Sequence, residues 1–176
     1  MYEQGFTLIE LMITLAVLAI IISLAAPSFV TMIQNNRATG ATNDLVASFQ
    51  LARTEAIKRN GTVLIKKKNG AGTRNCSGVG DWACGHLIGV DLDSDGSLTG
   101  AELLRDVKEP HLSIDIDSDN VEISYNGSGG VTTATTFTID SSPPPSPNCD
   151  PYVKKRTIQL GLSGSSTLTV SARACS

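Results

Sequence analysis

The chain opens with a long apolar segment that contains a single carboxylate. Apolar residues dominate from Phe6 to Ala26, and after Glu10 the next charged residue is Arg37. As an α-helix, about 20 residues span about 30 Å, the thickness of the hydrocarbon core of a bilayer. The pattern therefore predicts a membrane-spanning helix over residues 6–27. A carboxylate in hydrocarbon is unfavourable without a partner, so Glu10 is expected to have one.

A helical pattern continues beyond Pro27, although the polarity rises. Apolar residues recur at spacings of three and four and form one stripe along the helix. Asn60-Gly61 is a strong signal for a helix end. We expect one long helix that is interrupted or bent near Pro27 and ends near Asn60. The stripe consists of Ala38, Ala41, Leu45, Phe49, Ala52 and Ala56.

Short alternating runs follow this helix and are separated by turn residues. The turns include Asn69-Gly70, Asn126-Gly127 and the proline-rich stretch 141–148. Such spacing is typical of an antiparallel sheet, and packing of this sheet on the helix predicts an α+β fold. The expected strands are residues 62–67, 86–92, 112–117, 121–125, 131–139, 157–162 and 167–172.

Length and charge limit the function classes. The chain has 176 residues, which suits one membrane-proximal segment plus one globular domain, and its formal net charge of -3 argues against a dedicated nucleic-acid-binding domain. Residues 37–76 hold eight bases against two acids, and residues 81–122 hold eleven acids against two bases. We interpret these blocks as two solvated faces of opposite sign, or as polarity that orders subunits in an assembly.

Four cysteines, Cys76, Cys84, Cys149 and Cys175, allow three disulfide pairings. None of them forms a CxxC motif, which argues against a zinc site. An even number of cysteines behind an N-terminal membrane segment favours disulfides in an oxidising compartment. We expect Cys76 to pair with Cys84 and Cys149 to pair with Cys175.

Two ordinary explanations of the N-terminal segment are a cleavable secretory signal and a plain membrane anchor. A secretory signal needs a basic start, but Met1 to Gln4 contain no Lys or Arg. A plain anchor has the right length, but it leaves Glu10 without a role.

The N-terminal sequence Gly5-Phe6-Thr7-Leu8-Ile9-Glu10 resembles the signal of type IV pilins and type II secretion pseudopilins. The resemblance implies cleavage by a prepilin peptidase between Gly5 and Phe6, and methylation of the new N-terminus at Phe6. It also implies that Glu10 contacts the Phe6 amine of a neighbouring helix in the assembly, and that Pro27 kinks the helix. Unlike many members of the family, this chain has no basic residue in its leader.

The resemblance also implies a division of the chain. Residues 1–5 are the leader peptide, residues 6–27 the transmembrane and assembly helix, and residues 28–176 a periplasmic globular domain. The expected location is the bacterial inner membrane, crossed once, followed by incorporation into a pilus.

Within the pilins, the run from Leu51 to Asn60 resembles the end of the helix in the GspH/FimT family. The run 89–96, followed by 103–105, resembles the central hairpin of that family. These matches imply a minor pilin that primes type IV pilus assembly, with other minor pilins and the major pilin as partners. A type II secretion pseudopilin is the main alternative. A DNA-uptake receptor is less favoured, because Arg173 is the only base after Arg156.

The stretch from Asp91 to Glu102 satisfies the calcium-loop pattern D-x-D-x-D-G-x5-E. Asp91, Asp93, Asp95 and Glu102 would supply oxygen ligands. However, the preceding residues predict a strand where an EF-hand has a helix, and Asp and Gly also favour turns. We interpret the stretch as a hairpin turn, with calcium as the alternative and no other cofactor expected.

Catalytic motifs are absent from the sequence. The two histidines are not part of a recognisable nucleophile motif, and there is neither a GxSxG sequence nor a phosphate-binding glycine loop. We therefore expect a structural subunit and not an enzyme.

Overall fold

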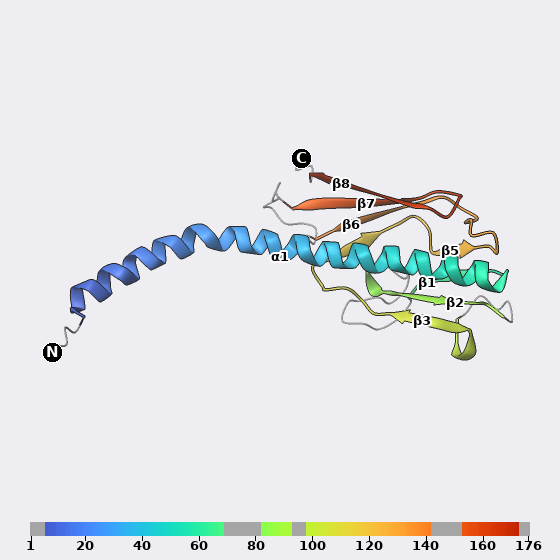
Figure 1. Cartoon of the computed structure of the whole chain (residues 1–176), viewed down its shortest axis with the longest axis horizontal. Coiled ribbons are helices and arrows are strands. Elements are labelled where there is room, and N and C mark those ends of the chain that lie inside the picture. The colour runs from blue at the N-terminus through green and yellow to red at the C-terminus, as the bar shows by residue number, and fades with distance from the viewer. Residues whose placement is uncertain (1–5, 69–81, 93–97, 142–152, 173–176) are drawn as a thin grey trace. The chain divides into compact units, whose positions relative to one another are not determined.

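The computed structural model describes residues 6–68, 82–92, 98–141 and 153–172 (Figure 1). Its first element is α1, a helix of 52 residues from Leu8 to Arg59. The chain divides into two compact units, Met1–Ile33 and Gln34–Ser176. Helix α1 begins in the first unit and ends in the second. It continues through Pro27, so of the expected interruption or bend the interruption is wrong.

In the first unit, α1 presents apolar side chains to its surroundings. Every side chain from Phe6 to Ser23 is exposed. Burial of such a surface against apolar neighbours is strongly favourable. When length and hydropathy are considered together, none of the helices in the described part of the chain meets the requirement for a membrane span.

In the second unit, α1 buries the stripe predicted from the sequence. All six of its residues are buried, from Ala38 to Ala56. The helix ends as the Asn60-Gly61 signal predicts, because Asn60 adopts a φ of 49°. Its N–H donates to Ile57 O at 3.1 Å, and the Gly61 N–H donates to Ala56 O at 3.1 Å. This pair of bonds is a Schellman motif, which satisfies carbonyls that the helix end leaves open.

In the described part of the chain, the strands form two antiparallel sheets of four strands each, whereas the sequence predicted a single sheet. The first sheet has the order β3-β2-β1-β5 and the second has the order β4-β6-β7-β8. Two short 3-10 helices are η1 (Trp82–Cys84) and η2 (Gly100–Glu102). The strands are β1 (Val63–Lys67), β2 (His86–Gly89), β3 (Leu103–Val107), β4 (Asp115–Asp117), β5 (Glu122–Tyr125), β6 (Thr135–Asp140), β7 (Lys154–Leu160) and β8 (Ser166–Ala172).

The core lies where residues 34–59 of α1 pack on both sheets (Figure 1). Phe49 of α1 contacts Phe137 of β6, with ring centroids 5.2 Å apart. Trp82 meets the same Phe137 ring edge to face at 4.9 Å. Aromatic pairs of this kind contribute about 0.5–1.5 kcal/mol beyond area burial. Among the described residues, every member of the buried core lies in Gln34–Ser176, so this unit has a hydrophobic core of its own.

Candidate functional site

The N-terminus of α1 is closed by a reciprocal pair of hydrogen bonds between Thr7 and Glu10. The carboxylate oxygen Oε2 of Glu10 accepts from the Thr7 N–H at 2.9 Å and from the Thr7 hydroxyl at 2.8 Å. In return, the Glu10 N–H donates to Thr7 Oγ1 at 3.3 Å. This arrangement is a capping box, which satisfies backbone donors at a helix start.

The capping box gives Glu10 a partner within its own chain. The sequence analysis predicted a partner only on a neighbouring subunit. The T-x-x-E pattern of Thr7 to Glu10 indicates a capping box, and this signal was missed. The bonds occupy Oε2, and within the described chain Oε1 accepts no hydrogen bond. Both residues follow the expected cleavage bond, so the box is compatible with a cleaved chain. Gly5 and the side chain of Pro27 lie outside the described residues.

In the stretch that matches the calcium-loop pattern, Glu102 has a structural role. Its Oε1 accepts from the Leu92 N–H at 2.8 Å and its Oε2 accepts from the Thr99 N–H at 3.2 Å. The Glu102 side chain is buried, and its two hydrogen bonds link Leu92 to Thr99 across the loop. Asp93 and Asp95 lie outside the described residues. These bonds favour the interpretation of the stretch as a turn.

We expect calcium to bind this loop weakly. With residues 28–176, 1 mM calcium should raise the free energy of unfolding by less than about 0.5 kcal/mol, which corresponds to a dissociation constant near or above 1 mM. Glu102→Ala should lower it by about 1–3 kcal/mol with or without calcium, because two backbone N–H groups lose their acceptor. Calorimetric titration and denaturant unfolding measure both effects. A micromolar site that Asp93→Ala abolishes would contradict this prediction.

Of the four cysteines, Cys84 is described. It lies in η1, is buried and is disulfide-bonded. Cys76, Cys149 and Cys175 lie outside the described residues, so the expected pairing stays a prediction.

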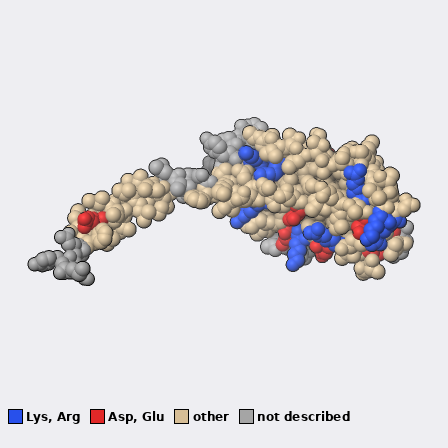
Figure 2. Space-filling view, in the orientation of Figure 1, with Lys and Arg blue, Asp and Glu red and all other residues tan. Residues whose placement is uncertain are grey.

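Several bases that could contact the phosphates of DNA have partners in the fold. Lys66 stands opposite Glu122 in the β1–β5 pair, with Nζ and Oε2 3.0 Å apart. Lys68 pairs with Asp106. These contacts join the basic and acidic sequence blocks because β1, β3 and β5 belong to one sheet, so the expectation of two separate faces is wrong here. Figure 2 shows blue and red groups next to one another over this part of the surface.

Arg156 is likewise engaged in the fold. Its guanidinium Nη2 donates to Asn35 O at 3.0 Å and to Thr39 Oγ1 at 2.8 Å. The Lys154 N–H donates to Asn35 Oδ1 at 3.0 Å. This end of β7 therefore fixes the second sheet to α1. Arg156 is buried, which leaves it unsuited to phosphate binding.

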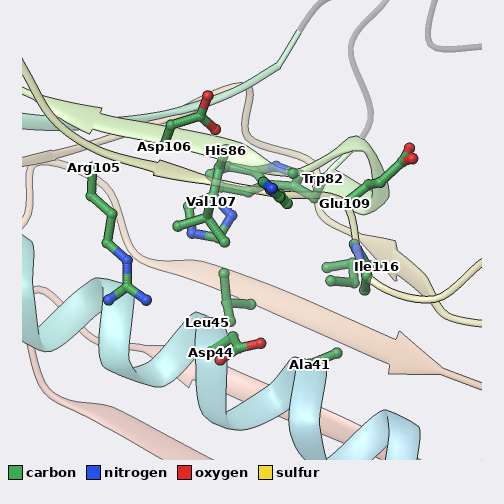
Figure 3. A pocket seen from close by; sticks show the side chains of 13 residues that line it. Ala41, Asp44, Leu45, Trp82, His86, Arg105, Asp106, Val107, Glu109 and Ile116 are labelled. Carbon is green, nitrogen blue, oxygen red and sulfur yellow. The ribbon is translucent and has the colours of Figure 1, made fainter. Parts of the chain in front are cut away.

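A cavity of about 260 Å³ lies between α1 and β3 (Figure 3). Its apolar wall includes Leu45, Trp82 and Ile116, and the Arg105 side chain extends from β3 toward α1. The remaining lining residues are Ala41, Asp44, Gly85, His86, Asp106, Val107, Lys108, Glu109 and Pro110.

His86 is the buried titratable group of this cavity. Its Nε2 lies 2.7 Å from Ser48 Oγ, and the Ser48 hydroxyl donates to Asp44 O at 2.8 Å. Because that hydroxyl has one proton, Nε2–H is the donor to Ser48. Burial, together with the charges of Lys68 and Arg105, lowers the pKa of His86 to about 4 against the opposing effect of Asp106. A neutral, hydrogen-bonded imidazole of this kind is a core residue.

The fold and the N-terminal motif together define a type IV pilin-like protein: a long N-terminal helix packed on antiparallel sheets. The family described as Prokaryotic N-terminal methylation motif matches residues 1–26, and the family described as Type II transport protein GspH matches residues 41–165. The chain belongs to the GspH family, since this second match covers more than half of it.

Solved structures with the same fold are crystal structures of the Pseudomonas aeruginosa type IV minor pilin FimU. One, in space group P21, has 20% sequence identity and a TM-score of 0.57, and the match covers 76% of this chain and 89% of that chain. A second, in space group P65, has 20% identity and a TM-score of 0.54, covering 74% and 91%. No curated protein matches the sequence. The expected pilin fold is confirmed.

Proposed function

We propose that the chain is a minor pilin of a type IV pilus, which helps to prime assembly and joins the tip complex to the major fibre. The observation that carries this proposal is the N-terminal methylation motif directly before an exposed apolar helix. Membership of the GspH family and the fold shared with the minor pilin FimU support it. In this role the chain is a structural subunit without catalytic activity, anchored in the inner membrane before assembly.

The second candidate is a pseudopilin of a type II secretion system. The description of the matching family, Type II transport protein GspH, favours it. Both candidates use the same helix and the same N-terminal chemistry. DNA uptake is less favoured, because Lys66, Lys68 and Arg156 are engaged within the fold.

The capping box suggests how Glu10 acts at assembly. Cleavage after Gly5 exposes a charged amine at Phe6. That amine, on a neighbouring subunit, finds an acceptor in Glu10 Oε1, while Oε2 keeps its bonds to Thr7. A buried ammonium left without a partner costs several kcal/mol, so the pair favours association of the helices.

Substitutions at Gly5 and Glu10 are expected to fail at different steps. Gly5→Val should block cleavage, because a branched side chain at the cleavage site hinders the peptidase. Glu10→Leu should be cleaved and remain in the membrane, yet be lost from sheared pili. Mass spectrometry of the N-terminus reports cleavage, and immunoblots of sheared pili report incorporation.

Two further variants separate charge from capping. Glu10→Gln keeps an oxygen for the capping box but removes the charge, and it should behave like Glu10→Leu. Thr7→Ala removes the hydroxyl but keeps the charge, and it should still be incorporated. Recovery of Glu10→Leu at wild-type stoichiometry would refute the ion pair. If the wild type is absent from sheared pili while its deletion abolishes protein secretion, the second candidate is correct.

A further inference from the structure

The two sheets have four edge strands, and three of them are protected against strand addition. The edges β3, β4 and β5 have five, three and four residues. Each carries charge: Arg105 and Asp106 in β3, two aspartates in β4, and Glu122 in β5. Short strands and charged side chains are the usual means of preventing edge-to-edge pairing.

The fourth edge, β8, has neither protection. It has seven residues, Ser-Thr-Leu-Thr-Val-Ser-Ala, without charge or proline. All seven pair with β7 in one unbroken register, so no bulge turns the edge away. Figure 1 shows β8 as the outermost strand of its sheet. A long, regular and uncharged edge of this kind is a template for an added strand.

The inner face of β8 is apolar, and no element of the described part of the chain covers it. Leu168 and Val170 stand opposite Ile158 and Arg156 of β7, which are buried beneath α1. Yet Leu168 and Val170 are 47% and 49% exposed, because the cover by α1 ends before β8. An added strand would bury these two side chains against its own.

The hydrogen-bond pattern shows which backbone groups point to the open edge. The Gly161 N–H donates to Ser165 O at 3.0 Å, which makes these residues a hydrogen-bonded pair at the end of the hairpin. Bonded and non-bonded pairs alternate along an antiparallel ladder. Leu168 and Val170 therefore belong to non-bonded pairs with β7, and their N–H and C=O groups point outward.

We propose that β8 receives an extended strand from a different subunit of the same assembly. This strand is uncharged at its centre and has apolar side chains at alternate positions, which meet Leu168 and Val170. The inference rests on the proposed function, since it names a contact by which the subunit enters the pilus.

A second copy of the chain is a poorer occupant. Its β3, β4 and β5 edges are short and charged. A symmetric antiparallel pair of β8 strands would reverse the direction of one subunit, whereas subunits entering one fibre share a direction. A parallel pair keeps the direction, but its bonds are weaker and it brings the basic Lys154 ends to the same side.

Val170→Pro tests the proposal in the full-length chain. Proline removes the outward N–H and blocks an incoming strand, but it breaks no bond to β7. The variant should be cleaved normally, and its recovery from sheared pili should fall about tenfold or more, the effect of about 1.4 kcal/mol. Val170→Lys keeps the N–H and adds a charge to the edge, and it should show the same loss. Val170→Thr keeps the N–H and the branched shape, and it should be incorporated like the wild type.

Thermal unfolding of residues 34–176 is the control for folding. The melting temperature of each variant should lie within a few degrees of that of the wild type. If Val170→Pro and Val170→Lys enter pili at the wild-type level, the proposal is wrong. If this fragment forms a homodimer that Val170→Pro dissociates, the edge belongs to a second copy, which also overturns the proposal. Absence of the wild type from pili would instead reject the proposed function, and with it the inference that rests on it.

Discussion

Gly164→Ala is expected to lower the free energy of unfolding by about 3 kcal/mol or more. Gly164 lies in the turn between β7 and β8 with a φ of +75°, and a Cβ there would lie 2.0 Å from Gly129 O. That atom is backbone, so it moves only if the turn 126–131 moves. The left-handed conformation adds about 1–2 kcal/mol for a residue with a side chain, and the overlap adds about 1–3 kcal/mol.

Two other glycines provide matched controls. Gly100 has a φ of +53° with no atom within 4 Å of a Cβ, so Gly100→Ala should cost about 1–2 kcal/mol through conformation alone. Gly40 lies exposed inside α1 with no atom within 4 Å, so Gly40→Ala should stabilise by about 0.5–1 kcal/mol. Denaturant unfolding of residues 34–176 gives all three values. If Gly164→Ala costs no more than Gly100→Ala, the close approach of the two turns is not important for stability.

The helix was predictable because its signals are local. The stripe from Ala38 to Ala56 follows the helical period, and Asn60-Gly61 specifies its end through backbone conformation. Both features depend on residues a few positions apart. The sequence therefore predicts the part of α1 in the unit Gln34–Ser176 almost to the residue.

Strand positions were predicted better than their arrangement. The edge strand β3 was not among the expected strands, because none of its residues is buried and its apolar and polar residues do not alternate. The division into two sheets was also missed, since alternation indicates which face is buried and leaves the choice of neighbouring strand open. That choice depends on long-range contacts, such as those of Phe137 with Phe49 and Trp82.

Among candidate site residues, the errors concern charged groups with more than one possible partner. The sequence identified Glu10 and Glu102, but it did not reveal the backbone N–H groups that donate hydrogen bonds to them. It interpreted Lys66 and Lys68 as part of a basic block, whereas strand pairing brings them to Glu122 and Asp106. A charge pattern along the chain does not reveal which charges meet, because the meeting depends on strand order.

His86 should make the stability of the globular unit depend on pH. Burial, with the charges of Lys68 and Arg105, lowers the pKa of His86 from its ordinary value of 6.5 to about 4, while Asp106 opposes this shift. The unfolded chain therefore takes up a proton at a pH at which the folded chain remains neutral. The contribution of the neutral His86 to the free energy of unfolding is complete above about pH 6.5 and is lost as the pH falls toward 4. A difference of this size corresponds to about 3 kcal/mol.

Comparison of variants separates the contribution of His86 from that of carboxylates that titrate in the same pH range. His86→Gln cannot take up the proton, so the wild type should be more stable than this variant at pH 8, and its advantage should shrink by about 3 kcal/mol by pH 4. Cavity carboxylates such as Asp44 and Glu109 are present in both proteins and cancel in the comparison. His111 is exposed and bonded to Ser113, so His111→Gln serves as the matched histidine control outside the cavity. Denaturant unfolding of residues 34–176 across this pH range measures the curves. Parallel curves for the wild type and His86→Gln would mean that His86 is protonated as readily in the folded chain as in the unfolded chain, despite its burial against Ser48 and Trp82.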